Sequence, residues 1–341
     1  DHKITASNSD IQQLLDLALG NNAPVSLYGM SMYSIEYEII DSQGLADTLS
    51  GLVSFPKDPT KSFPLASYQH GTTIEDNNVP SVTGLNLSNQ EVSIISIVMA
   101  SSGFIIMLPD YEGLGSSGGY HPYIIADTYT PAITNMIRAV KQLSTNLDIN
   151  NSFMYNNQLY LFGYSEGGYA TMAAQRDIEQ SMSDEFNLTA TFPMAGPYDL
   201  SGTMVDFYLS INFYPQPYYV ANVLFNHLHY YDTLQNLNQY FLPFWADTLS
   251  GLFDGSHSGS FINSMMPDSP IEILLPAVID DFSSNSNNLF RQTLEQNSLL
   301  DWTPASPTYL IHAIADDIIP IENAQIAYNT LIDNSANSVY L

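Results

Sequence analysis

The chain of 341 residues contains no cysteine. Without thiols it can form no disulfide, hold no iron–sulfur cluster and bind no zinc ion through sulfur, and it has no thiol nucleophile. The absence excludes thiol chemistry and leaves the cellular compartment open. Hydrophobic residues make up 45% of the chain, which is enough to build a sizeable buried core.

Basic residues are also scarce. Lysine and arginine number 7 against 35 aspartate and glutamate residues, and the formal net charge is −28. A surface of this kind repels phosphate backbones and anionic lipids, so we expect no nucleic-acid partner. We interpret the acidity as a source of solubility, as in secreted, salt-exposed or cold-exposed proteins, and no protein partner is evident.

Long apolar runs are missing as well. The longest candidate, Val92 to Leu108, is interrupted by four serines and Gly103, so the sequence predicts no transmembrane segment. The chain begins at Asp1 without an initiator methionine or a basic and then apolar leader, which weakly favours a secreted or cell-envelope protein. Asp280-Asp281 and Asp316-Asp317 lack the spacing of a calcium loop, and we expect no metal ion.

The N-terminal part mixes one helix with antiparallel strands. Ser9 to Gln12 fit a capping box that opens an amphipathic helix, which Gly20 ends. Tyr33 to Ile40 and Leu49 to Phe55 are typical of an antiparallel pair.

Strands and helices alternate from residue 63 to about residue 200. The predicted strands are Phe63–Tyr68, Phe104–Leu108, Leu159–Gly163 and Leu188–Met194, and the predicted helices are Glu91–Ala100, one opened by Thr130-Pro131 in its first turn, and Ser165–Met182. Such alternation predicts a mostly parallel sheet with helices on both faces. The alternation of strands and helices resumes after residue 300, with a predicted strand at Thr308–Ile314, a helix at Ile321–Ile332 and the start of a strand at Val339.

Between about Leu200 and Asp301 the alternation stops and aromatic residues become frequent. One interpretation is a small helical subdomain whose own core uses these rings. The other is a cap that lends some rings to an apolar substrate pocket, and both can hold at once. We therefore expect a core of residues 1–200 and 301–341 and a helical cap or lid of residues 201–300.

Gly163-Tyr164-Ser165-Glu166-Gly167 follows a predicted strand and opens a predicted helix. This is the setting in which a G-x-S-x-G pattern presents a nucleophilic serine on a sharp turn, with glycines leaving room for close packing. The pattern makes Ser165 the expected nucleophile. The less specific interpretation is a glycine-rich helix start with an incidental serine.

Two backbone N–H groups are expected to bind the oxyanion. One belongs to Glu166, the residue after the nucleophile, and the other to the loop after the strand that ends near Gln69. In that loop Thr72 is the preferred donor and Thr73 the alternative. His70 and Gly71 are expected to support the loop, with His70 stiffening it by hydrogen bonds.

The acid of a catalytic triad should follow the serine at the end of a later strand. Asp316 follows the predicted strand Thr308–Ile314 and is the preferred acid, with Asp317 as the alternative. Whichever of the two is not the acid would cap the next helix.

The order of these motifs, together with Pro109 to Gly115, resembles that of α/β-hydrolase-fold esterases. The residues within the motifs are most similar to those of the secretory lipases. The resemblance implies the α/β-hydrolase fold, with a helical cap inserted before the acid-bearing strand. It also implies cleavage of small-molecule or lipid carboxylic esters through an acyl-enzyme, without a cofactor, and a structural role for Asp110 and Tyr111.

The resemblance places the general base, a histidine, after Asp316, where the sequence has none. The histidines present are His2, His70, His121, His227, His229, His257 and His312. We expect the base beyond Leu341, in a chain that is incomplete at its C-terminus; otherwise His121 and His312 become candidates. His227 and His229 could line the underside of the cap or stay solvated.

Two other functions remain open at this point. The same attack and oxyanion site would serve a serine peptidase or amidase, and a decayed triad would leave a hydrolase-like binding protein.

Overall fold

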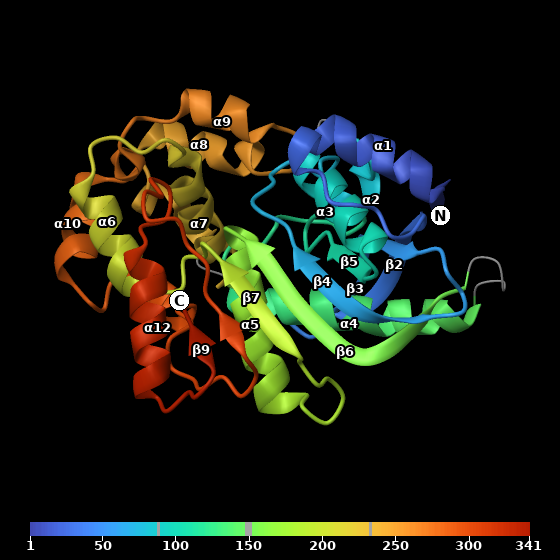
Figure 1. The fold of residues 1–341 in the computed structure, drawn as a ribbon. Coiled ribbons are helices and arrows are strands. Elements are labelled where there is room, and N and C mark those ends of the chain that lie inside the picture. Colours follow the sequence, from blue (N-terminus) through green and yellow to red (C-terminus); the bar gives the residue numbers. More distant parts are fainter. Residues whose placement is uncertain (87–88, 147–151, 232–233) are drawn as a thin grey trace.

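A computed structural model describes residues 1–86, 89–146, 152–231 and 234–341. Its described strands form one nine-stranded sheet in the order β1-β2-β3-β5-β4-β6-β7-β8-β9 (Figure 1). The strands are β1 His2–Ala6, β2 Met30–Ile40, β3 Ala46–Pro56, β4 Ser62–Gln69, β5 Ile105–Pro109, β6 Met154–Tyr164, β7 Ala190–Met194, β8 Thr308–Tyr309 and β9 Val339–Tyr340. β1, β2, β3 and β5 pair antiparallel, and all pairs from β5 to β9 are parallel. The predicted mostly parallel sheet is confirmed.

Helices cover both faces of the sheet. As a result, alternate residues of its central strands are buried on opposite sides. In β5, Ile105 and Met107 belong to one buried cluster, while Ile106 and Leu108 belong to the other. The helices preceding β7 are α1 Asn8–Leu19, α2 Pro80–Thr83, α3 Gln90–Ser101, α4 Ala126–Asn146 and α5 Glu166–Ser181. Buried residues of α1 and α3 fall in the second cluster and those of α4 and α5 in the first, so the two helix pairs lie on opposite faces.

The chain between β7 and β8 is helical and lies to one side of the sheet (Figure 1). It contains α6 Val205–Ser210, α7 Pro217–Tyr230, α8 Pro243–Leu252, α9 Gly259–Met265, α10 Pro276–Ser284 and α11 Leu289–Gln296. Tyr218, Phe225 and Phe241 are buried within it, so its aromatic residues do build a core. A β-bridge joins Met194 to Ile311, so this segment leaves and rejoins the sheet at neighbouring strands. α12 Glu322–Asp333 then connects β8 to β9.

Some predicted boundaries are wrong for identifiable reasons. The helix cap is Ser7, not Ser9: Asp10 N–H donates to Ser7 Oγ, and Asp10 Oδ2 accepts from Ser7 N–H. Pro131 lies inside α4, which already begins at Ala126. β1 was not predicted, and β8 is shorter than Thr308–Ile314 because regular pairing ends after Tyr309, with one isolated bridge at Ile311.

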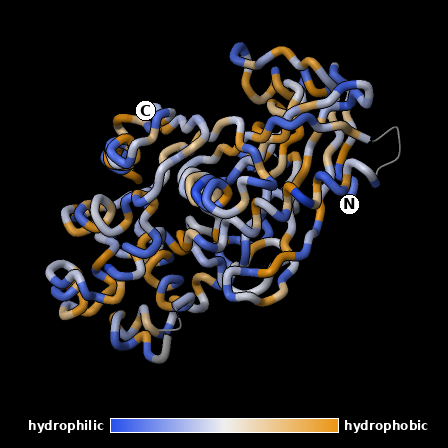
Figure 2. The backbone as a smooth tube through the Cα atoms, turned by 90° about the horizontal axis from the view of Figure 1, so that it is seen from below, coloured by the Kyte–Doolittle hydropathy of each residue, from blue (hydrophilic) through white to orange (hydrophobic). Residues whose placement is uncertain are grey.

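Hydrophobic and hydrophilic residues are mixed along most of the tube in Figure 2. Accordingly, none of the helices formed by the described residues is both long and apolar enough to cross a membrane.

Candidate active site

Ser165 occupies a strained turn between β6 and α5. Its backbone angles are φ 59° and ψ −120°, a region that residues with a Cβ atom rarely adopt. The flanking glycines make the turn possible, because a Cβ atom on Gly163 would collide with the Gly167 carbonyl and one on Gly168 with the Met194 carbonyl. The local sequence thus holds Ser165 at the carboxyl end of the sheet and at the start of a helix.

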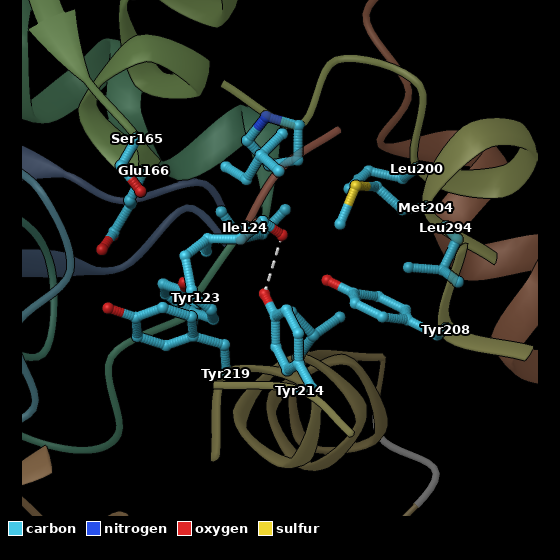
Figure 3. A pocket seen from close by; sticks show the side chains of 14 residues that line it. Tyr123, Ile124, Ser165, Glu166, Leu200, Met204, Tyr208, Tyr214, Tyr219 and Leu294 are labelled. Carbon is cyan, nitrogen blue, oxygen red and sulfur yellow. Dashed lines mark hydrogen bonds between the residues drawn. The ribbon is translucent and has the colours of Figure 1, made fainter. Parts of the chain in front are cut away.

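A narrow cavity of about 30 Å³ lies in front of Ser165. Figure 3 shows tyrosine rings on the side of this cavity opposite Ser165 and Glu166. The Tyr214 hydroxyl donates to the Ile318 carbonyl, 3.0 Å away, and so ties the segment before α7 to the chain after β8 (Figure 3). The lining residues are Tyr123, Ile124, Ser165, Glu166, Pro197, Leu200, Met204, Tyr208, Tyr214, Tyr219, Val223, Leu294, Ile318 and Ile319.

The loop after β4 carries Thr72, the expected oxyanion donor. No acceptor in the described part of the chain takes a hydrogen bond from the Thr72 N–H, while its Oγ1 lies 2.9 Å from the Tyr123 hydroxyl at the cavity. The Glu166 N–H belongs to the first residue of α5, where no intrahelical acceptor exists. Thr73 is buried, and its hydroxyl faces the Asn78 carbonyl at 3.5 Å.

Hydrogen bonds fix this loop from several sides. The His70 ring nitrogen Nδ1 lies 2.8 Å from the Gly71 carbonyl, and the Gly71 N–H donates to Glu91 at 2.8 Å. The Tyr111 hydroxyl donates to the His70 carbonyl at 3.0 Å. These contacts are those of a supporting role for His70 and Gly71. The neighbouring Asp110 is fully buried.

Asp316 lies after β8, near the nucleophile turn. Its Oδ1 accepts from the N–H groups of Ile318 and Ile319, each at 2.9 Å, and both of these residues line the cavity. Partial burial, followed by the charges of Asp316 and Glu91, raises the pKa of Tyr164, which precedes Ser165. Asp317 is exposed. Of the two aspartates, Asp316 is therefore the one whose hydrogen-bond partners line the cavity together with Ser165.

His312, one of the two alternative bases, and the cap histidines His227 and His229 all have partners other than Ser165. His312 Nε2 lies 2.8 Å from the Ile319 carbonyl and 3.4 Å from Asp316 Oδ2. His227 belongs to α7 and is buried, with Nε2 3.2 Å from the Ile124 carbonyl oxygen, and His229 packs edge-on against Tyr120. In the described residues, no hydrogen bond connects a histidine to the Ser165 hydroxyl.

Sequence reasoning missed a buried pair behind the nucleophile. His121 is only 8% exposed, and its Nε2 lies 2.6 Å from Oε1 of Glu166. Tyr129 donates to the same oxygen at 2.9 Å. The sequence signal for this pair was the carboxylate of Glu166 at the start of a helix whose next residues are mostly small or apolar and buried. A buried carboxylate requires a partner.

Comparison with known proteins agrees with this fold. The family model of secretory lipases matches residues 80–191. The rice cell wall degrading esterase LipA from Xanthomonas oryzae is 27% identical, with a TM-score of 0.88 over 100% of this chain and 89% of LipA. A putative hydrolase from Legionella pneumophila is 25% identical, with a TM-score of 0.87 and the same coverage.

Candida antarctica lipase A in its closed state shares the fold at 18% identity, with a TM-score of 0.70 over 100% of this chain and 75% of that lipase. Among curated proteins, no sequence matches the chain. The chain thus has the α/β-hydrolase fold and resembles esterases and lipases. These similarities support a hydrolase of the lipase or esterase type. Within the described residues, no group of three or more acidic, histidine or cysteine side chains is arranged to hold a metal ion.

Proposed function

We propose that this chain is a secreted serine hydrolase of carboxylic esters, a carboxylesterase or lipase that works through an acyl-enzyme. The observation that carries the proposal is Ser165 itself, held at positive φ between β6 and α5 with its side chain at an apolar cavity. Such strain persists only where the surrounding structure enforces it, and it clusters at functional sites. The acidic surface and the match to secretory lipases support export.

In the proposed reaction a histidine takes the Ser165 proton while Oγ attacks the ester carbonyl. In α/β-hydrolases the chain order is Ser, Asp, His, so this base belongs after the acid, and Asp316 is proposed to orient it. The N–H groups of Thr72 and Glu166 bind the oxyanion, the alcohol leaves, and water then releases the acid from the acyl-enzyme.

The helical segment between β7 and β8 acts as the cap. Met204, Tyr214 and Tyr219 reach the cavity from it, so the rings that build the cap core also face the substrate. An apolar lining of this kind suits the acyl group of an ester.

The test is covalent labelling of full-length protein by a fluorophosphonate, with Ser165→Ala as the comparison. We expect stoichiometric labelling and burst release of p-nitrophenol from p-nitrophenyl esters, both absent in Ser165→Ala. A higher kcat/KM for aminoacyl-anilides than for esters would identify a peptidase or amidase instead. No labelling of the folded protein would favour a binding protein.

A further inference from the structure

Behind the proposed oxyanion site lies a buried ionic group that the reaction above does not use. The carboxylate of Glu166, 1% exposed, belongs to the residue whose backbone N–H faces the oxyanion. Its Oε1 accepts from His121 and Tyr129, while Oε2 has no hydrogen-bond partner among the described residues. A buried carboxylate is costly unless it is paired, so its position depends on these two contacts.

The geometry fits a doubly protonated ring on His121 beside an ionised Glu166. Its Nε2 lies 2.6 Å from the Glu166 carboxylate and its Nδ1 lies 2.8 Å from the Glu112 carbonyl oxygen. A neutral imidazole has one N–H and could satisfy only one of these two acceptors, whereas an imidazolium satisfies both. His121 and Glu166 therefore form a charged pair held at both ends.

Stacked rings connect this pair to the other oxyanion donor. The ring of His121 stacks on Tyr111 with centroids 5.9 Å apart and planes at 15°, and Tyr111 stacks on His70 at 4.2 Å and 23°. His70 lies two residues before Thr72, and its carbonyl accepts the Tyr111 hydroxyl. The stacked rings of His121, Tyr111 and His70 thus connect the two backbone segments that carry the N–H groups of Glu166 and Thr72.

We propose that His121 is a positioning residue of the reaction: its protonated ring holds the Glu166 carboxylate and thereby aims the Glu166 N–H at the oxyanion. This inference rests on the proposed serine-hydrolase function and adds a residue to it. His121 does not touch the substrate. Since oxyanion donors act on the transition state, a displaced donor lowers kcat and leaves substrate binding nearly unchanged.

The charges around His121 favour its protonated form. Burial by itself would lower the pKa of His121, but the charge of Glu166, the hydrogen bond to it and the Glu112 contacts outweigh burial and raise the net pKa. The ionisable groups facing the ring are Glu166 on α5, Tyr129 on α4, Asp76 after β4, and Tyr111, Glu112 and Tyr123 between β5 and α4. From α7, only the neutral Asn222 and Asn226 share a cavity with it.

The experiment compares full-length His121→Gln and Glu166→Gln with the wild type. His121→Gln removes the charge but keeps an amide donor, and Glu166→Gln keeps the shape of the acceptor. We expect kcat per fluorophosphonate-titrated site to fall about ten- to a hundredfold, less than the loss of a whole oxyanion donor, with KM within about twofold. His2→Gln, a change at an exposed histidine, is the control and should leave both constants unchanged.

The pH profile separates positioning from simple stability. In the wild type, kcat should fall as pH rises through the raised pKa of His121, and this alkaline limb should disappear in both variants. If either variant fails to fold, Tyr129→Phe removes the other donor to Glu166 and should lower kcat in the same direction. Wild-type kcat and an unchanged alkaline limb in folded variants would overturn the inference. Failure of the wild type to react with the fluorophosphonate would instead reject the proposed function.

Discussion

The carbonyl oxygen of Gln69, at the end of β4, lies directly against the Cα atom of Gly167 on α5. A Cβ atom at residue 167 would overlap this oxygen and the carbonyl carbon of Gln69. The contact joins the strand before the oxyanion loop to the helix after the nucleophile, so the spacing of the two oxyanion donors depends on it.

Gly167→Ala should therefore lower both stability and activity. The obstacle is backbone, which cannot move aside as a flexible side chain could, and we expect a loss of about 3 kcal/mol in the free energy of unfolding. Gly118→Ala is the matched control, because a Cβ atom there meets nothing within 4 Å. Denaturant unfolding of both variants measures the difference, and equal stabilities would contradict the described turn.

Asp316→Asn should abolish most activity without unfolding the protein. The asparagine oxygen can still accept from Ile318 and Ile319, but the charge that would stabilise a protonated base is lost. We expect kcat to fall about 10³- to 10⁴-fold, as for the acid of other triads. The exposed Asp317→Asn is the control, and a larger loss in that variant would make Asp317 the acid.

The size of the cavity predicts a preference for short acyl groups. A cavity of about 30 Å³ leaves room for only a few small groups, which suits an acetyl methyl group better than a long chain. In a series of p-nitrophenyl esters, kcat/KM should be highest for acetate or propionate and decline towards octanoate.

Enlarging the cavity should shift this optimum. Leu294→Ala removes a buried side chain that lines it, so the best substrate should become longer. Phe244→Ala, at an exposed position of α8, should keep the wild-type order. A wild-type optimum at octanoate would show that the cavity opens before substrate enters.

His227 should make the protein less stable in acid. Burial lowers its pKa to about 4 from the ordinary histidine value of about 6.5, so the unfolded chain binds a proton more readily than the folded one. The sign follows from linkage: stability is constant above pH 6.5 and is lost as pH falls towards 4, by about 2 kcal/mol at pH 5.

His227→Leu should remove this part of the pH dependence, although it also loses the hydrogen bond to the Ile124 carbonyl at every pH. Free energies of unfolding at pH 7 and pH 5 test it. If wild type and variant lose the same stability between the two pH values, His227 is not buried in its neutral form.

The sequence predicted the fold well, because its strands are short apolar runs and its helices have clear periodicity. It also placed Ser165 in a strand–turn–helix, since the glycines around it leave few other conformations. The contact between His121 and Glu166 could not be predicted, because the two residues are 45 positions apart and neither lies in a pattern that refers to the other. Pro131 was misplaced because proline is far more common in the first turn of a helix than inside one.

The bridge between Met194 and Ile311 also bears on how this enzyme could diversify. Both ends of the helical insertion are fixed to adjacent strands, so its length and sequence can change without altering the sheet register. Substituting the insertion of a related hydrolase would graft a new specificity onto an unchanged reaction centre. We therefore expect the insertion to tolerate exchange better than the strands that frame it, in natural recombination as well as in engineering.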